Sequence, residues 1–267
     1  MSATVADLED AAFARLTEAG ERLPAGSAMR HDYGPHPDQF VEVHGDVAGA
    51  SAVVVFVHGG YFREGIDLAH ARPLAKCLAE AGAACVLVEY RRAGGRPHCL
   101  VDVSAALDFT LESLPVWGLD AEVPLTISGH SAGGCLVLAW ASYLGEMGPS
   151  VRLRPLAPIT DLFREATEGL GDGAVLDYMG VRPEEDLDAY LEEDPRSRAV
   201  LIPNRVDVLT LHGDADCVVD IGFSRTFPAR LRELAGANHA DLVDPDSAYF
   251  PTLVEALLGA EGEGSSR

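Results

Sequence analysis

The sequence has few basic residues and no long apolar run. Only 20 lysines and arginines stand against 42 aspartates and glutamates, which gives a formal net charge of −22 at pH 7. A surface of this sign repels phosphate backbones and anionic lipids, so nucleic acid is not an expected partner. No stretch approaches the roughly 18 uninterrupted apolar residues that a helix needs to cross a bilayer, so no membrane partner is expected either.

The cysteines and the first residues argue against two further classes of protein. The number of cysteines is odd and none has CxxC spacing, so neither a disulfide framework nor a cysteine-based metal or redox site is indicated; they are Cys77, Cys85, Cys99, Cys135 and Cys217. Residues 1–30 begin MSATVADLEDAAFARL, which is acidic and amphipathic, whereas a signal peptide has a basic start followed by an apolar run. We therefore expect a cytoplasmic protein with reduced thiols and an N-terminal helical extension over 1–30.

Hydrophobic patterning predicts the fold class. The chain of 267 residues, 48% of them apolar, is expected to form a single domain over 1–267. Apolar residues at helical spacing predict crossover helices around 74–81 and 100–111, and the segment 132–144 is apolar almost all round, as a buried helix would be. An outer strand and four buried central strands are predicted at 39–44, 52–57, 84–89, 123–128 and 206–211. This alternation favours an α/β fold with a mostly parallel central sheet and helices on both faces.

Residues 161–200 do not follow the alternation. They contain closely spaced glycines, a charged run and Pro195 in place of a clean strand and helix. Two interpretations stay open. We favour a small cap that acts as a lid over a binding site, because long irregular insertions are often functional. The alternative is a solvated surface excursion without a role in binding.

The strongest motif is Gly129-His130-Ser131-Ala132-Gly133, which lies between a predicted strand and a predicted helix. A serine flanked by glycines at this spacing is typical of a tight turn that presents a nucleophilic Oγ, since a Cβ at either glycine would collide with the neighbouring strand or helix. The helix that starts here also directs its first amides, and the positive end of its dipole, at the site. We predict Ser131 as a nucleophile and the amide of Ala132 as a donor to an oxyanion; a plain glycine turn is the alternative.

A second glycine motif follows the predicted strand 52–57. It reads His58-Gly59-Gly60-Tyr61-Phe62, and the two glycines let the backbone approach a reacting group closely. We predict that the amides of Gly60 and Tyr61 complete an oxyanion hole with Ala132. His58 is predicted to hold the loop by hydrogen bonding rather than to act as an acid or base.

Candidates for the acid and the base lie near the end of the chain. Asp214 and Asp216 both follow the predicted strand 206–211, and His239 is the only histidine after them. This matches the chain order serine, acid, histidine in which such sites are found on α/β folds. His239 would take the proton of Ser131, while one aspartate would orient its imidazole. The remaining histidines lack spacings such as HExxH, so no metal site is predicted.

Together these residues resemble the α/β-hydrolase family over about 32–260. The resemblance implies the α/β-hydrolase fold with 161–200 as a cap, and the pattern HGxxDxxV implies Asp216 as the acid, with Asp214 shaping the turn. The segment HGGYF looks like the HGGxW loop of kynurenine formamidase and related arylformamidases, and Tyr33-Gly34-Pro35 is similar to their YGP segment. Those enzymes hydrolyse N-formyl-kynurenine to kynurenine and formate without a cofactor. The sequence departs from them at Phe62, where they carry tryptophan, and at Ala240, where an aromatic residue is usual.

The predicted function is therefore that of a serine hydrolase acting on a small aromatic amide or ester through an acyl-enzyme on Ser131. Tyr61, Phe62 and His130 are predicted to contact the substrate; Phe163 and Tyr178 belong either to the pocket or to the core. A carboxylesterase, an acyltransferase or cyclase with the same triad, and a non-catalytic binding module stay open. A small molecule is the expected partner, no cofactor or metal is expected, and a homodimer is compatible with the sequence.

Overall fold

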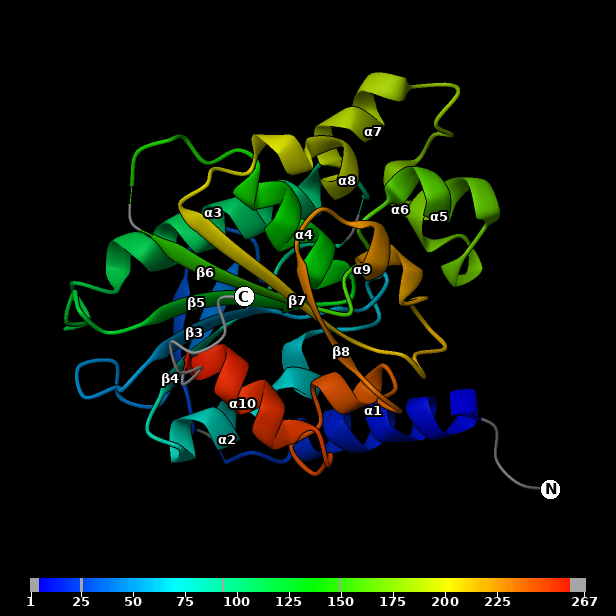
Figure 1. The fold of residues 1–267 in the computed structure, drawn as a ribbon. Helices are drawn as coiled ribbons and strands as arrows, with labels where there is room; N and C mark the ends of the chain where they lie inside the picture. Colours follow the sequence, from blue (N-terminus) through cyan, green and yellow to red (C-terminus); the bar gives the residue numbers. More distant parts are fainter. Residues whose placement is uncertain (1–4, 25, 93, 149, 260–267) are drawn as a thin grey trace, which may run out of the picture.

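The computed structural model describes residues 5–24, 26–92, 94–148 and 150–259, and these form one sheet flanked by helices (Figure 1). The strand order is β1-β2-β4-β3-β5-β6-β7-β8. The β1–β2 and β2–β4 pairs are antiparallel, and every pair from β4 to β8 is parallel, so the predicted mostly parallel sheet is confirmed. The strands are β1 (Met29–Asp32), β2 (Phe40–His44), β3 (Val53–Val57), β4 (Ala84–Val88), β5 (Leu125–His130), β6 (Val151–Leu156), β7 (Val206–Gly213) and β8 (Arg230–Leu234).

The five predicted strands correspond to β2, β3, β4, β5 and β7, whereas β1, β6 and β8 were not predicted. The sequence of β6, VRLRPL, contains two arginines, which obscure an apolar strand pattern. Arg154 nevertheless lies inside the protein, because its guanidinium donates to Asp207 O at 2.8 Å and to the Asp207 carboxylate at 2.9 Å. β1 and β8 are edge strands; β1 has no buried residue and β8 has one, which is too few to give a clear apolar pattern.

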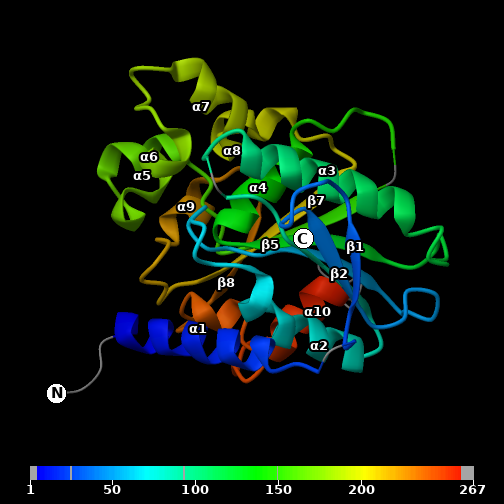
Figure 2. The same ribbon diagram turned by 180° about the vertical axis from the view of Figure 1, so that it is seen from behind.

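Helices cover both faces of the sheet, as predicted (Figures 1 and 2). The central strand β3 is buried on both sides: Val53, Val55 and Val57 face one core, and Val54 and Phe56 face the other. This two-sided burial explains why the strand is a continuous apolar run. The first core includes α3 (His98–Ser113) and α4 (Ala132–Ala141); the second includes α2 (Arg72–Glu80), α10 (Phe250–Leu258) and one residue of α1 (Val5–Glu21).

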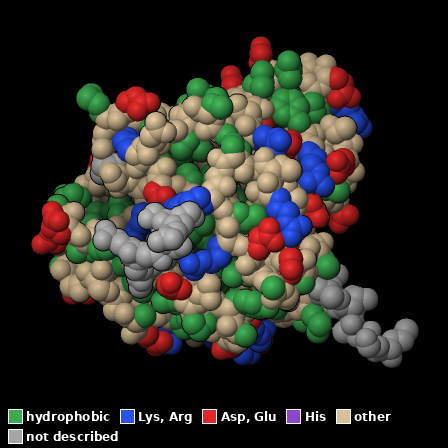
Figure 3. All heavy atoms as spheres, viewed as in Figure 1, with side chains coloured by type: hydrophobic (Ala, Val, Ile, Leu, Met, Phe, Trp, Pro, Cys, Tyr) green, Lys and Arg blue, Asp and Glu red, His purple; other side chains and the backbone are tan. Residues whose placement is uncertain are grey.

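Residues 161–200 fold as a group of short helices at the upper edge of the molecule in Figure 1. These are α5 (Leu162–Glu168), α6 (Ala174–Met179), α7 (Leu187–Glu193) and α8 (Pro195–Arg198), with 3-10 turns at Gly171–Gly173 and Ala199–Leu201. A short helix, α9 (Gly222–Thr226), lies beside them, and 3-10 turns also occur at Leu68–Ala71 and Ala240–Leu242. Within the described ranges, no helix is both long and apolar enough to cross a membrane. Acidic and basic side chains are interspersed on the face shown in Figure 3.

Candidate active site

Ser131 lies in the turn between β5 and α4. Its φ of 57° and ψ of −119° are backbone angles that residues with a side chain rarely adopt. The turn is held by backbone hydrogen bonds: Ser131 N–H donates to Leu156 O at 2.9 Å, and Ser131 O accepts from Cys135 N–H at 3.1 Å and from Ile159 N–H at 3.4 Å. A strained conformation that its surroundings hold in place is characteristic of functional turns, and of this strand-to-helix turn in particular.

The glycines on either side of Ser131 are required by close packing. A Cβ at Gly129 would lie 2.4 Å from Gly133 O, and a Cβ at Gly133 would lie 2.2 Å from Val57 O. Both contacts are with backbone atoms, which cannot move aside without displacing the helix or the strand. Glycine at both positions therefore allows α4 to pack directly against β3 and β5.

The structure brings Asp216 and His239 together. Their loops follow β7 and β8, and His239 Nδ1 lies 2.6 Å from Asp216 Oδ2, with both side chains almost inaccessible to solvent. His212 Nε2 lies 3.2 Å from the same oxygen. Burial alone would raise the pKa of Asp216, but His239 and His212 hold that pKa well below its usual range. An ionised Asp216 directs Nδ1–H of His239 toward itself and leaves Nε2 to exchange a proton with a nucleophile.

The two candidate acids have different surroundings. Asp216 Oδ1 accepts hydrogen bonds from the N–H groups of Val218 and Val219, both at 2.8 Å, which leaves Oδ2 facing the imidazole. Asp214 is exposed, and its Oδ1 accepts from Gly236 N–H at 2.6 Å. Asp214 thus ties one turn to the next, whereas Asp216 contacts His239.

The loop after β3 packs against the nucleophile. A Cβ at Gly59 would lie 3.0 Å from Ser131 Cβ, so the loop backbone and the serine are in direct contact. Gly60 has a φ of 129° and Tyr61 a φ of 55°, both in the region that favours glycine. As the first residue of α4, Ala132 has an amide without a partner inside the helix. The loop after β3 and the start of α4 thus both lie next to Ser131, and the oxyanion hole formed by the amides of Gly60, Tyr61 and Ala132 stays a prediction.

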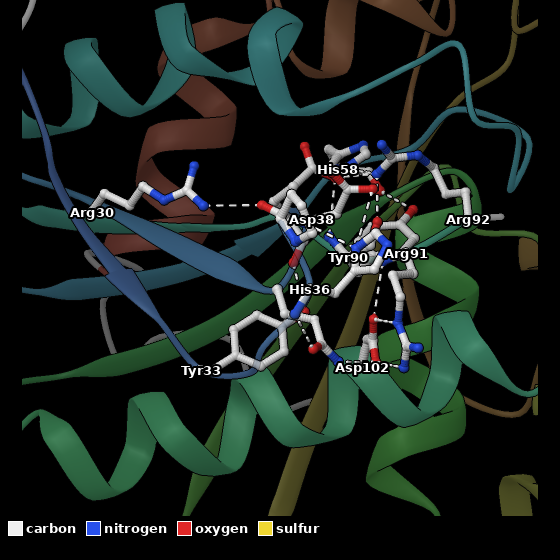
Figure 4. Close-up of polar contacts among 12 residues, drawn as sticks. Arg30, Tyr33, His36, Asp38, His58, Tyr90, Arg91, Arg92 and Asp102 are labelled. Atoms are coloured by element: carbon white, nitrogen blue, oxygen red, sulfur yellow. Dashed lines mark hydrogen bonds and ion pairs between the residues drawn. The ribbon is translucent and has the colours of Figure 1, made fainter.

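A buried polar cluster that includes His58, Tyr90 and Arg92 holds the start of the loop after β3 (Figure 4). His58 Nδ1 lies 2.6 Å from Gly59 O, His58 Nε2 lies 3.2 Å from Glu89 Oε1, and Tyr90 Oη donates to His58 O at 3.0 Å. Arg92 forms an ion pair with the same Glu89 carboxylate. Burial alone would raise the pKa of Glu89, but His58 and Arg92 lower that pKa to about 2. These contacts give His58 the structural role predicted for it.

The Tyr33-Gly34-Pro35 segment reaches the same cluster. Tyr33 Oη donates to Glu89 O at 2.7 Å, which fixes the end of β4 next to the loop. Beside it, the buried carboxylate of Asp102 pairs with Arg91 at 2.7 Å and accepts from Gln39 Nε2 at 2.8 Å; Figure 4 shows the Arg91–Asp102 pair. The Tyr33-Gly34-Pro35 segment thus supports the site indirectly, through the backbone of Glu89 at the end of β4.

A cavity of about 210 Å³ has Ser131 and His239 in its wall. Tyr61 and His130, two of the predicted substrate contacts, also line it. Burial and then the carboxylates of Asp10 and Asp216 raise the pKa of Tyr61 to about 12, so its hydroxyl is uncharged at neutral pH. The rest of the wall is formed by Glu9, Asp10, Phe13, Ala14, Thr17, Gly59, Gly60, Ile66, His70 and Val218.

Phe62, the third predicted substrate contact, lies elsewhere. It is 4% exposed and stacks on Tyr178, with ring centroids 4.3 Å apart and planes inclined by 12°. Phe163 packs against Tyr190 with ring centroids 5.0 Å apart. Of the two roles left open for Phe163 and Tyr178, the structure therefore gives them the core. The prediction that Phe62 contacts the substrate is corrected in the same way, because its ring is buried against Tyr178 and does not line the cavity.

Helix α1 contributes to the wall of the cavity. None of the described residues lining the cavity belongs to 161–200, whereas Glu9, Phe13 and Thr17 do line it from α1. The spacing of four residues places these three on one helix face. The only sequence signal was the acidic, amphipathic character of the first residues, which indicates a helix and one apolar face but does not say where the helix docks.

His130 has a second contact besides the cavity. Its Nε2 lies 3.1 Å from His239 O, and the side chain is 1% exposed. Burial, followed by the nearby imidazole of His239, holds the pKa of His130 well below its usual range, so the ring is neutral. A neutral ring with Nε2–H can donate to the carbonyl. His130 therefore holds the backbone of the loop that carries His239.

Known proteins are similar to this chain in sequence and in fold. Residues 54–223 match the model of a family described as alpha/beta hydrolase fold. Esterase LipC of Mycobacterium tuberculosis is 27% identical over 264 residues, which cover 85% of this chain and 65% of that protein. Probable carboxylic ester hydrolase LipM of the same organism is 26% identical over 71% of this chain and 47% of its own length. The chain thus spans less than two thirds of either curated relative.

Among solved structures, Thermogutta terrifontis esterase 2 is similar with a TM-score of 0.66 and 18% identity. The similarity covers 92% of this chain and 98% of that one. At this identity the likeness establishes the shared fold and no more.

Proposed function

The chain belongs to the α/β-hydrolase family, and on this basis we propose that it is a serine carboxylic ester hydrolase for small acyl groups. The observation that carries the proposal is the 2.6 Å contact between Asp216 and His239 in a site whose cavity also contains the strained Ser131. The printed names of the curated relatives, an esterase and a probable carboxylic ester hydrolase, support the choice of an ester substrate.

The reaction would proceed in two steps. Ser131 Oγ attacks the ester carbonyl while His239 takes its proton, and the resulting oxyanion is stabilised by the amides of Gly60, Tyr61 and Ala132. His239 then protonates the leaving alcohol, which departs and leaves an acyl-enzyme. In the second step His239 takes a proton from water and the hydroxide attacks the acyl carbon. When this intermediate collapses, His239 returns the proton to Ser131 Oγ and the carboxylic acid is released.

The cavity supports a small acyl group. Its volume of about 210 Å³ is below the roughly 300–1,000 Å³ of pockets that hold drug-sized ligands. Phe13, Ile66 and Val218 give it apolar walls, which suit a short aliphatic or a compact aromatic group.

The test compares initial rates on p-nitrophenyl acetate, butyrate and laurate, with Ser131→Ala as the blank. We expect Ser131-dependent cleavage that falls steeply from butyrate to laurate, because the laurate chain exceeds the cavity. The variant should keep the wild-type melting temperature, since a hydroxyl is the only group lost. Equal cleavage by wild type and Ser131→Ala, or no cleavage of any ester, would contradict the proposal.

A narrower candidate is an arylformamidase-like amidase. The HGGYF and YGP segments favour it, and so does the small cavity, because formyl is the smallest acyl group. Adding N-formyl-kynurenine to the substrate series separates the two candidates. A kcat/KM for deformylation well above that for the acetate ester would assign the amidase; ester cleavage alone would leave the esterase.

A further inference from the structure

The N-terminal helix α1 is part of the wall of the catalytic cavity. It packs against the turns at Leu68–Ala71 and Ala240–Leu242, and the second of these directly follows His239. The ring of Phe13 packs beside two histidines of the site, with centroids 6.1 Å from His239 and 6.0 Å from His130. The helix therefore faces the base rather than only the surface of the domain.

One residue of α1 bonds directly to the residue that carries the base. Glu9 Oε1 accepts a hydrogen bond from the backbone N–H of His239 at 2.9 Å, and Glu9 is 1% exposed. His239 is thus held at three points: its N–H by Glu9, its carbonyl by His130, and its ring by Asp216. Each contact comes from a different segment of the chain.

The buried position of Glu9 is unfavourable for the stability of the fold. Glu9 Oε2 is buried without a hydrogen-bond partner. Burial raises the pKa of Glu9, the nearby charge of Asp216 raises it further, and the backbone amides of His239 and Cys217 lower it. A buried, partly satisfied carboxyl beside a like charge costs folding free energy. Such local conflicts are expected where a residue serves the site rather than stability.

The docking of α1 does not depend on Glu9 alone. Arg15 forms ion pairs with Asp244 and, at 2.9 Å, with Asp246, and Leu16 is buried in the core beneath the helix. The helix is therefore attached at points farther along its length. Changing Glu9 should remove the contact with His239 while α1 stays in place.

We infer that Glu9 is a positioning residue for His239: by accepting from its backbone N–H, Glu9 fixes the loop that aims the imidazole at Ser131. This inference rests on the proposed function, since it assigns His239 the role of base. It also makes α1 a component of the catalytic site, although Glu9 lies more than a hundred residues before Ser131 in the chain.

The experiment uses two substitutions of similar size. Glu9→Met keeps the bulk and helix propensity but removes the acceptor, whereas Glu9→Gln keeps an oxygen that can accept from His239 N–H. Glu18→Ala, at an exposed position of the same helix, is the matched control. For each variant we would measure kcat and KM on p-nitrophenyl acetate, the melting temperature, and the rate at which a fluorophosphonate forms a bond to Ser131 Oγ with release of fluoride.

We expect Glu9→Met to lower kcat and the phosphonylation rate roughly 10- to 100-fold with KM changed much less. Glu9→Gln should restore most of both rates, and Glu18→Ala should match wild type. Wild-type rates in Glu9→Met, or equal losses in Glu9→Met and Glu9→Gln, would overturn the inference. If Glu9→Met did not fold, Glu9→Ala would replace it in the same comparison. A wild-type protein that neither cleaves esters nor reacts with the fluorophosphonate would instead refute the proposed function.

Discussion

Replacing Asp216 by asparagine is expected to preserve the fold and remove most of the activity. Asp216 Oδ1 accepts from the N–H groups of Val218 and Val219, both at 2.8 Å, and Oδ2 faces His239 Nδ1 at 2.6 Å. An asparagine must keep its oxygen toward the two amides, because its NH₂ group would otherwise face two donors. The NH₂ group then points at His239 Nδ1, which must act as an acceptor, so the ring proton moves to Nε2.

An imidazole protonated at Nε2 cannot take the proton of Ser131. In a Ser-His-Asp site this tautomer defect lowers kcat by about 10⁴-fold, which corresponds to about 5 kcal/mol of transition-state stabilisation. We expect a loss of this order in Asp216→Asn, with KM little changed because the cavity wall is intact. Asp214→Asn is the matched control: its remaining oxygen can still accept from Gly236 N–H, so we expect a change of at most about twofold.

The assay is the Ser131-dependent rate on p-nitrophenyl acetate, with circular dichroism and melting temperature to show that both variants fold. A larger loss in Asp214→Asn than in Asp216→Asn would refute the assignment of the acid. Comparable small losses in both would refute the tautomer argument. They would mean that His239 keeps its proton on Nδ1, with Nε2 free to act as the base, even without a carboxylate at Nδ1.

Three further predictions concern the surroundings of the site. Gly133→Ala should destabilise the fold by about 1–3 kcal/mol, since its Cβ would meet Val57 O at 2.2 Å, whereas Gly145→Ala, with no atom within 4 Å, should leave the melting temperature unchanged. Phe62→Ala should cost about 3–5 kcal/mol in urea unfolding, as a core residue does; a change confined to KM would return Phe62 to the pocket. Glu89→Gln should be less stable than wild type by about 3 kcal/mol at pH 7, because His58 and Arg92 outweigh the effect of burial and lower the pKa of Glu89 from 4.5 to about 2. A depressed pKa stabilises above the unfolded value, so this difference should shrink as the pH falls from about 4.5 toward 2, and a constant difference would contradict the ion-pair argument.

The features predicted well are those whose constraint shows in the residue types of one short segment. The central strands are apolar on both faces because helices cover both faces, and the elbow needs its glycines because β3, β5 and α4 meet there at backbone distance. In both cases the constraint fixes the residue types of one short segment, so a short window of sequence contains the signal. Strand β6 was not predicted because the charge of Arg154 is paired with Asp207. This partner lies on the adjacent strand β7, outside any short window of sequence around β6.

The same distinction explains what was missed at the site itself. Chain order indicates that His239 follows Asp216, but not that His239 is also held by Glu9, which lies 230 residues earlier and bonds to its backbone rather than to its ring. A backbone donor leaves no signature in the residue type at 239, and a single glutamate on an amphipathic helix resembles any solvated charge. The helix could be predicted from its pattern, whereas its docking against the base depends on a surface that exists only once the sheet has formed. For this reason the sequence alone does not show that α1 contributes to the wall of the cavity.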